Sequence, residues 1–146
     1  MGVRREAREL ALQALYQLDM SGDEDPARSL ALFWSHFRGR DDARSFAREL
    51  VEGVCAERER LDALIRQCAE HWRLPRLSRV DLNLLRLATF ELLACAEIPT
   101  SVSINEAVEI ARRFGGEDSA GFVNGVLDAI ATLLGAKAKE KPGGAE

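Results

Sequence analysis

The stretch RVDLNLLRLATFELL, residues 79–93, decides the fold because it is apolar on almost every side of a helix. A helix that is hydrophobic all round normally lies at the centre of a protein. Ser78 and Asp81 stand at its start with the spacing of a capping-box variant. The sequence therefore predicts a central helix over residues 78–94.

Apolar residues recur at helical spacing on both sides of this segment, and no stretch alternates as a strand does. Short connections between helices favour antiparallel neighbours and hence helical bundles. We therefore expect an all-α fold of about seven helices. Their expected ranges are 4–20, 27–37, 43–72 with a break near 55–58, 78–94, 102–114 and 118–134.

Composition indicates one ordinary globular domain over residues 1–136 and a disordered polar tail over 137–146. No apolar run approaches the length of a membrane span, and polar residues interrupt the N-terminal segment, unlike a signal peptide. We therefore expect the protein to be located in the cytoplasm. The net charge of −4 argues against a general nucleic-acid binder.

Chemistry-bearing residues are sparse. The three cysteines, Cys55, Cys68 and Cys95, lie far apart and are interpreted as small buried side chains rather than metal ligands. His36 and His71 are isolated beside aromatic residues, which favours a core or boundary position. There is no phosphate-binding loop, nucleophile elbow or pair of catalytic carboxylates. We expect no enzyme activity, no cofactor and no metal.

The expected first helix combines basic and aromatic residues on one side. On a helical wheel Tyr16 lies about 170° from the centre of the apolar stripe, Arg5 shares its side, and Arg8 borders it. Arginine suits phosphates and base edges, and an aromatic ring can stack on an unpaired base. This arrangement is the one expected for single-stranded nucleic acid. Taken alone, however, the stretch favours a solvated charged helix end, with Tyr16 covered by a second bundle.

The segment GFVNGVLD, residues 121–128, sets Gly121 and Gly125 on one side of the last expected helix, opposite its apolar stripe. Each glycine costs a helix about 0.5–1 kcal/mol relative to alanine. The interpretation favoured by the pattern is close helix–helix packing. A groove for the backbone of a ligand is the alternative.

The segment IPTSVSINEAVEIARRFGGEDSAGFVNGVLD, residues 98–128, resembles the bacterial NusB family of transcription antitermination factors, as do residues 79–93 and RREARELALQALYQ, residues 4–17. The resemblance spans about residues 3–134. It implies two small helical bundles packed crosswise and a protein that is not an enzyme. It also implies binding of box A RNA from ribosomal RNA leader transcripts together with NusE, a small-subunit ribosomal protein, in an RNA polymerase complex.

The resemblance implies RNA contacts by residues that match the family's basic, aromatic and acidic positions, namely Arg4, Arg5, Arg8, Tyr16, Asp118 and Phe122. The polar exceptions on the central helix, Asp81, Asn83 and Arg86, are candidates for a partner-binding surface. A homodimer is a further possibility. The competing interpretation is a protein-interaction module without RNA binding of its own. A methyltransferase would need a cofactor-binding domain, for which the chain has neither the length nor the glycine-rich turn.

Overall fold

The computed structural model describes residues 2–22, 26–36, 41–69 and 77–135. These residues form seven helices and no strand, which confirms the all-α prediction. The helices are α1 (Gly2–Ser21), α2 (Pro26–His36), α3 (Asp41–Ala56), α4 (Arg58–Cys68), α5 (Arg79–Ala94), α6 (Thr100–Phe114) and α7 (Ser119–Leu134). His71 and the expected tail lie outside the described residues.

The helix ends follow local chemistry. The hydroxyl of Ser78 accepts a hydrogen bond from the backbone N–H of Asp81 at 3.0 Å, so the predicted cap of α5 is confirmed. The predicted break in the long helical stretch falls at Glu57, between α3 and α4. Helix α6 begins two residues earlier than expected because Pro99, whose fixed φ suits a helix start, is its N-cap. Gly135, with φ of 68°, ends α7 in the left-handed conformation.

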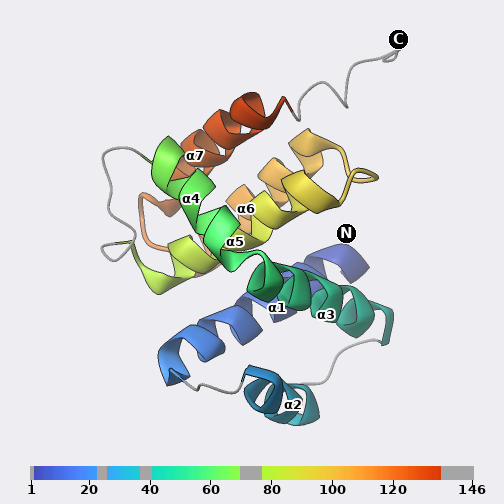
Figure 1. Cartoon of the computed structure of the whole chain (residues 1–146). Helices are drawn as coiled ribbons and strands as arrows, with labels where there is room; N and C mark the ends of the chain where they lie inside the picture. The colour runs from blue at the N-terminus through green and yellow to red at the C-terminus, as the bar shows by residue number, and fades with distance from the viewer. Residues whose placement is uncertain (1, 23–25, 37–40, 70–76, 136–146) are drawn as a thin grey trace.

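The helices form two groups that meet at α5. Figure 1 shows α1, α2 and α3 below α4, α5, α6 and α7. Helix α5 packs against α1, α3, α4, α6 and α7, and several of its leucines, such as Leu84 and Leu85, are fully buried. The predicted central helix and the arrangement in two bundles are therefore confirmed.

A buried ion pair joins the N-terminal half of α1 to the end of α5. Arg8 donates from Nε and Nη2 to the two carboxylate oxygens of Glu91 at 2.8 and 2.9 Å. The hydroxyl of Ser103 in α6 donates to the same carboxylate at 2.8 Å. The expectation that Arg8 points away from the core is wrong, because a partner 83 residues away draws its guanidinium inward.

A second group of charges joins the C-terminal end of α1 to α4 and α5, and we call it the Asp19 cluster. The Asp19 carboxylate accepts from Asn83 at 2.9 Å, from Arg58 and Arg79 at 3.3 Å each, and from Arg86 at 3.5 Å. Only 9% of the Asp19 side chain is exposed. The cluster thus fixes the end of α1 beside the first turns of α4 and α5.

Two of the candidate partner-binding residues therefore lie inside the molecule. Asn83 and Arg86 are buried, and Arg86 also donates to both oxygens of Asp62 in α4, at 2.7 and 3.0 Å. The expectation that they mark an exposed surface is wrong. Polar residues on a buried helix find charged partners on neighbouring helices because unpaired buried charge is costly.

The glycine face of α7 is open. Gly121 and Gly125 are exposed, and a Cβ at either position would meet no atom within 4 Å. The packing interpretation is therefore wrong, since no other helix uses the missing side chains. Gly53 in α3 shows the opposite situation, because a Cβ there would lie 2.0 Å from Cζ of Phe90.

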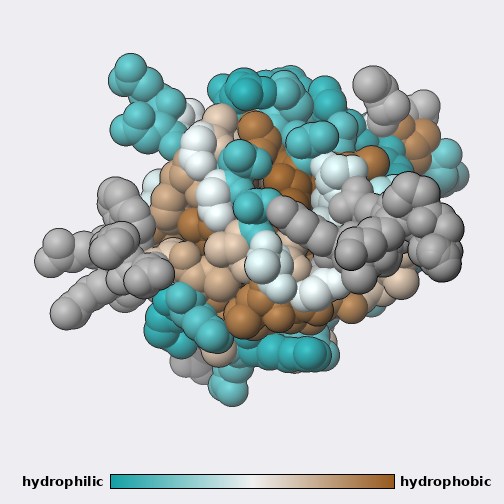
Figure 2. All heavy atoms as spheres, turned by 90° about the horizontal axis from the view of Figure 1, so that it is seen from above, coloured by the Kyte–Doolittle hydropathy of each residue, from teal (hydrophilic) through white to brown (hydrophobic). Residues whose placement is uncertain are grey.

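The molecular surface is mixed. Seen from above, on the side where Figure 1 places α7, apolar surface lies between hydrophilic side chains (Figure 2). Cys95 is buried as predicted, but Cys55 and His36 are exposed, so those two placements are wrong. Within the described ranges, no helix has both the length and the apolar character needed to cross a membrane.

Replacing Glu91 by glutamine is expected to lower the free energy of unfolding by about 3 kcal/mol, because the buried Arg8 loses the carboxylate to which it donates two hydrogen bonds and keeps only Glu106, 3.9 Å from its Nη1. Equilibrium urea unfolding followed by circular dichroism measures this. Replacing both residues with apolar ones of similar volume, Arg8→Met with Glu91→Leu, should cost less than the single change. Wild-type stability of Glu91→Gln would contradict the importance of the pair.

The two kinds of helical glycine should respond oppositely to alanine. Gly125→Ala is expected to raise the free energy of unfolding by about 0.5–1 kcal/mol, since its site is open and helical. Gly53→Ala should lower it by about 1–3 kcal/mol, because the Phe90 ring must move. Thermal unfolding of the two variants side by side tests both; a change of the same sign in both would refute the distinction.

Candidate functional site

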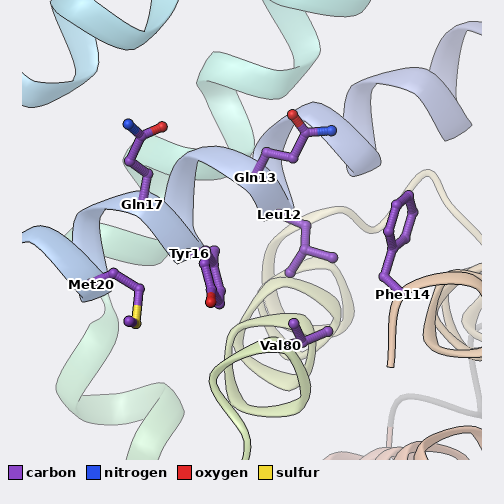
Figure 3. Close-up of a pocket in the computed structure, with 7 residues that line it drawn as sticks. All are labelled: Leu12, Gln13, Tyr16, Gln17, Met20, Val80 and Phe114. Atoms are coloured by element: carbon purple, nitrogen blue, oxygen red, sulfur yellow. The ribbon is translucent and has the colours of Figure 1, made fainter. Parts of the chain in front are cut away.

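An apolar cleft lies between α1 and the first turn of α5, and we call it the α1 cleft. It has a volume of about 510 Å³. Figure 3 shows Leu12 and Tyr16 of α1 pointing toward Val80 of α5, with Met20 at one end and Phe114 of α6 at the other. The cleft therefore brings together the C-terminal half of α1, the start of α5 and the end of α6, which are distant in sequence.

Tyr16 points away from the buried side of its own helix, as the helical wheel predicted, and 39% of its surface is exposed. Its neighbours in the α1 cleft, Met20 and Phe114, are 59% and 42% exposed. Among the described residues the other exposed large apolar side chains are Leu32, Val102 and Leu133. Since none of these three lines the α1 cleft, the cleft is where exposed apolar surface gathers around a hollow.

A second hollow, of about 320 Å³, opens beside the next residue of α5, and we call it the acidic hollow. Asp81, Glu117 and Asp118 supply its carboxylates, and Phe122 supplies an aromatic wall. Val80 lines the α1 cleft, and the next residue, Asp81, lines the acidic hollow. The cleft and the hollow therefore lie on either side of the same turn of α5. The structure thus brings the predicted Tyr16, Asp118 and Phe122 to one end of α5.

The loop before α7 shapes the acidic hollow. The hydroxyl of Ser119 accepts a hydrogen bond from the N–H of Gly116 at 2.9 Å, which closes the turn between α6 and α7. Asp118 is exposed and makes no side-chain cap on the helix that it precedes. One buried oxygen of Asp81 accepts no hydrogen bond within the described part of the chain. The exposed carboxylate of Asp118 can accept hydrogen bonds from a bound group.

The N-terminal arginines have different environments. Arg4 is exposed and its guanidinium lies 4.9 Å from the centre of the Phe46 ring. Arg5 donates two hydrogen bonds to Glu106, at 2.7 and 2.8 Å, and its side chain remains 29% exposed. Arg8 is buried against Glu91. Two of the three predicted guanidinium groups are therefore already paired with carboxylates.

Several residues of this region were missed by the sequence interpretation. Met20 and Phe114 were assigned no role because helical spacing does not show which helix ends meet. Asp19 and Asp62 likewise give no local indication that they pair with Asn83 or Arg86. No group of three or more His, Cys, Asp or Glu side chains is placed to hold a metal ion in the ranges that the structure describes.

Two carboxyl groups in these networks have shifted pKa values. Burial raises the pKa of Asp19, but the hydrogen bond from the Asn83 amide and the charges of the nearby arginines lower it by more. The pKa of Asp19 therefore lies below its ordinary value of 3.8. The hydrogen bonds from Arg5 lower the pKa of Glu106 below its ordinary value of 4.5. Both groups bind fewer protons in the folded state than in the unfolded state at mildly acidic pH.

The stability that these carboxylates contribute is therefore present above their ordinary pKa values and is lost as the pH falls through the lowered ones. Asp19→Asn should be less stable than the wild type at neutral pH, and the difference should narrow as the pH approaches about 3. Urea unfolding of both proteins across this range measures the difference. A difference that is independent of pH would show that the Asp19 charge is not involved.

Comparison with known proteins gives a consistent match. The model of the NusB family matches residues 5–132. The transcription antitermination protein NusB of Myxococcus xanthus (strain DK1622) is 52% identical over 138 residues, covering 92% of this chain and 98% of that protein.

Two solved structures extend the match to the fold. NusB of T. maritima has a TM-score of 0.80 and 42% identity, with 88% of this chain and 90% of that one covered. A chain from a crystal structure of the antitermination factors NusB and NusE in complex with dsRNA has a TM-score of 0.77 and 27% identity, covering 91% and 98%. Since the family model matches most of its residues and the relatives align along nearly their whole length, this chain belongs to the NusB family.

Proposed function

We propose that this protein is a transcription antitermination factor that binds box A RNA of ribosomal RNA leader transcripts together with NusE. In this role it supports processive elongation by RNA polymerase, acts in the cytoplasm and performs no catalysis. The observation that carries the proposal is the similarity to the chain crystallised with NusE and dsRNA, which extends over 91% of this chain.

The α1 cleft suits an unpaired base. Tyr16 offers an exposed ring beside apolar walls from Leu12, Val80 and Phe114. Stacking of a base on an aromatic side chain stabilises a complex by about 1–3 kcal/mol. A paired base cannot enter such a cleft without leaving its helix, which favours single-stranded RNA here.

The acidic hollow provides a second contact of a different kind. Phe122 is half-buried and offers an edge or face to a base, while Asp118 accepts hydrogen bonds from amino or imino groups. Carboxylates repel phosphates, so the RNA backbone has to pass outside this hollow. We propose base contacts by Asp118 and Phe122 and phosphate contacts elsewhere.

Phosphate contacts are proposed for Arg4 and Arg5. Arg4 is exposed, whereas Arg5 has to exchange Glu106 for a phosphate. Arg8 is not proposed, because its guanidinium is buried and already makes two hydrogen bonds to Glu91. So few phosphate contacts, on a chain with a net charge of −4, favour weak binding alone and a need for NusE.

Titration of a labelled box A single strand at several salt concentrations, with and without NusE, tests the proposal. Two phosphate contacts give a log–log salt slope of about −1.4, so binding should weaken about sevenfold between about 50 and 200 mM salt. NusE should tighten RNA binding at least about tenfold, and RNA should tighten NusE binding equally. An affinity indifferent to NusE, or no binding at all, would favour the protein-interaction module.

In the same titration Tyr16→Ala is expected to weaken RNA binding about tenfold or more, since it removes one stacked base. Its free energy of unfolding should change by less than about 1 kcal/mol, because the ring faces the cleft rather than the core. Leu32→Ala is the matched control, since it removes an exposed apolar side chain from α2. Equal RNA affinity of the two variants would argue against a role for the α1 cleft.

A further inference from the structure

We propose that Asp19 is a positioning residue for RNA binding: by tying the end of α1 to the first turn of α5, it holds the two walls of the α1 cleft at the separation that a base requires. This inference rests on the proposed function and adds to it a residue outside the binding surface. The α1 cleft itself is lined neither by Asp19 nor by its ion-pair partners.

Asp19 and its partner Arg79 each stand beside a wall of the cleft. Asp19 lies three positions after Tyr16, which makes the two residues neighbours on the helix surface, and it directly precedes Met20 in the chain. Arg79 directly precedes Val80 on the opposite wall. The contact of 3.3 Å between Arg79 Nη1 and Asp19 Oδ2 therefore ties the part of α1 that carries Tyr16 to the residue that precedes Val80.

The other members of the Asp19 cluster fix the orientation of the Asp19 carboxylate in this contact. The Asn83 amide holds the same carboxylate oxygen at 2.9 Å, and Arg58 of α4 approaches the other oxygen at 3.3 Å. Arg86 is in turn fixed to α4 through both oxygens of Asp62. Apolar packing resists sliding weakly because it has no direction, whereas charge-assisted hydrogen bonds fix both distance and orientation.

The test uses two substitutions that change the net charge in opposite directions. Asp19→Asn removes a negative charge, and charge alone would make it bind RNA more tightly. Arg79→Gln removes a positive charge from a partly exposed partner. If the ion pair positions the cleft, both variants should bind the labelled box A strand in the presence of NusE at least about fivefold more weakly, in contrast to the opposite effects expected from charge.

A spectroscopic measurement on the free protein reports the cleft directly. Tyr16 is the only tyrosine of the chain, so labelling tyrosine rings gives a single set of NMR signals. Both variants should shift or broaden these signals. Glu57→Gln and Arg60→Gln are charge-matched controls, since these residues form an exposed i,i+3 pair at the start of α4. They should change neither the signals nor the RNA affinity beyond about twofold.

Circular dichroism establishes whether each variant is folded at the temperature of the assay. If Asp19→Asn is not folded, the RNA affinity and Tyr16 signals of Arg79→Gln decide the test. Tighter or unchanged RNA binding by Asp19→Asn, or unmoved Tyr16 signals in both cluster variants, overturns the inference. If the wild type binds no RNA even with NusE, the proposed function fails. The Tyr16 signals then still decide whether the Asp19 cluster positions the cleft.

Discussion

Helix α1 is held against α5 by charge at two places. Arg8 pairs with Glu91 near the end of α5, and Asp19 meets Arg79 and Asn83 near its start, so the two helices cross antiparallel. The two points are eleven residues apart on α1, about 16 Å along a helix. Apolar side chains between them could pack in several registers, but two fixed charge contacts admit only one.

The candidate site depends on this arrangement. With the register of α1 fixed, Tyr16 and Val80 line the α1 cleft together. The loop after α6 then meets the same end of α5 from the other side and adds the acidic hollow. An aromatic cleft and an acidic hollow thus lie on adjacent sides of one helical turn, the first with an exposed aromatic ring and the second with carboxylates that accept hydrogen bonds.

Much of the fold could be predicted from the sequence because helical periodicity and caps are local. The wholly apolar segment 79–93 indicated the central helix, and Ser78 marked its start. The outward position of Tyr16 also followed from the wheel, since it lies opposite the apolar stripe. The motif in residues 98–128 indicated the family, although no local pattern could have shown that Phe114 and Met20 meet at one cleft.

The predictions that were wrong concern residues whose environment depends on neighbours that are distant in sequence. A helical wheel shows on which side of its helix Arg8 lies, but it does not show that the carboxylate of Glu91 packs against that side. Asn83 and Arg86 look like surface residues until their acidic partners on α1 and α4 are known. Gly125 and Gly53 both lack a side chain in a helix, and only the tertiary structure shows that the first faces open space and the second faces Phe90.

The pairing of Arg8 with Glu91 also has a consequence for biosynthesis. Arg8 leaves the ribosome long before Glu91, which follows it by 83 residues. Burying Arg8 without that carboxylate is unfavourable, so α1 has to keep this arginine in water while α2, α3 and α4 are being made. In proteins of several domains the N-terminal domain commonly folds first during synthesis. Within this chain, by contrast, we expect the first helix to reach its final position only after Glu91 has been translated.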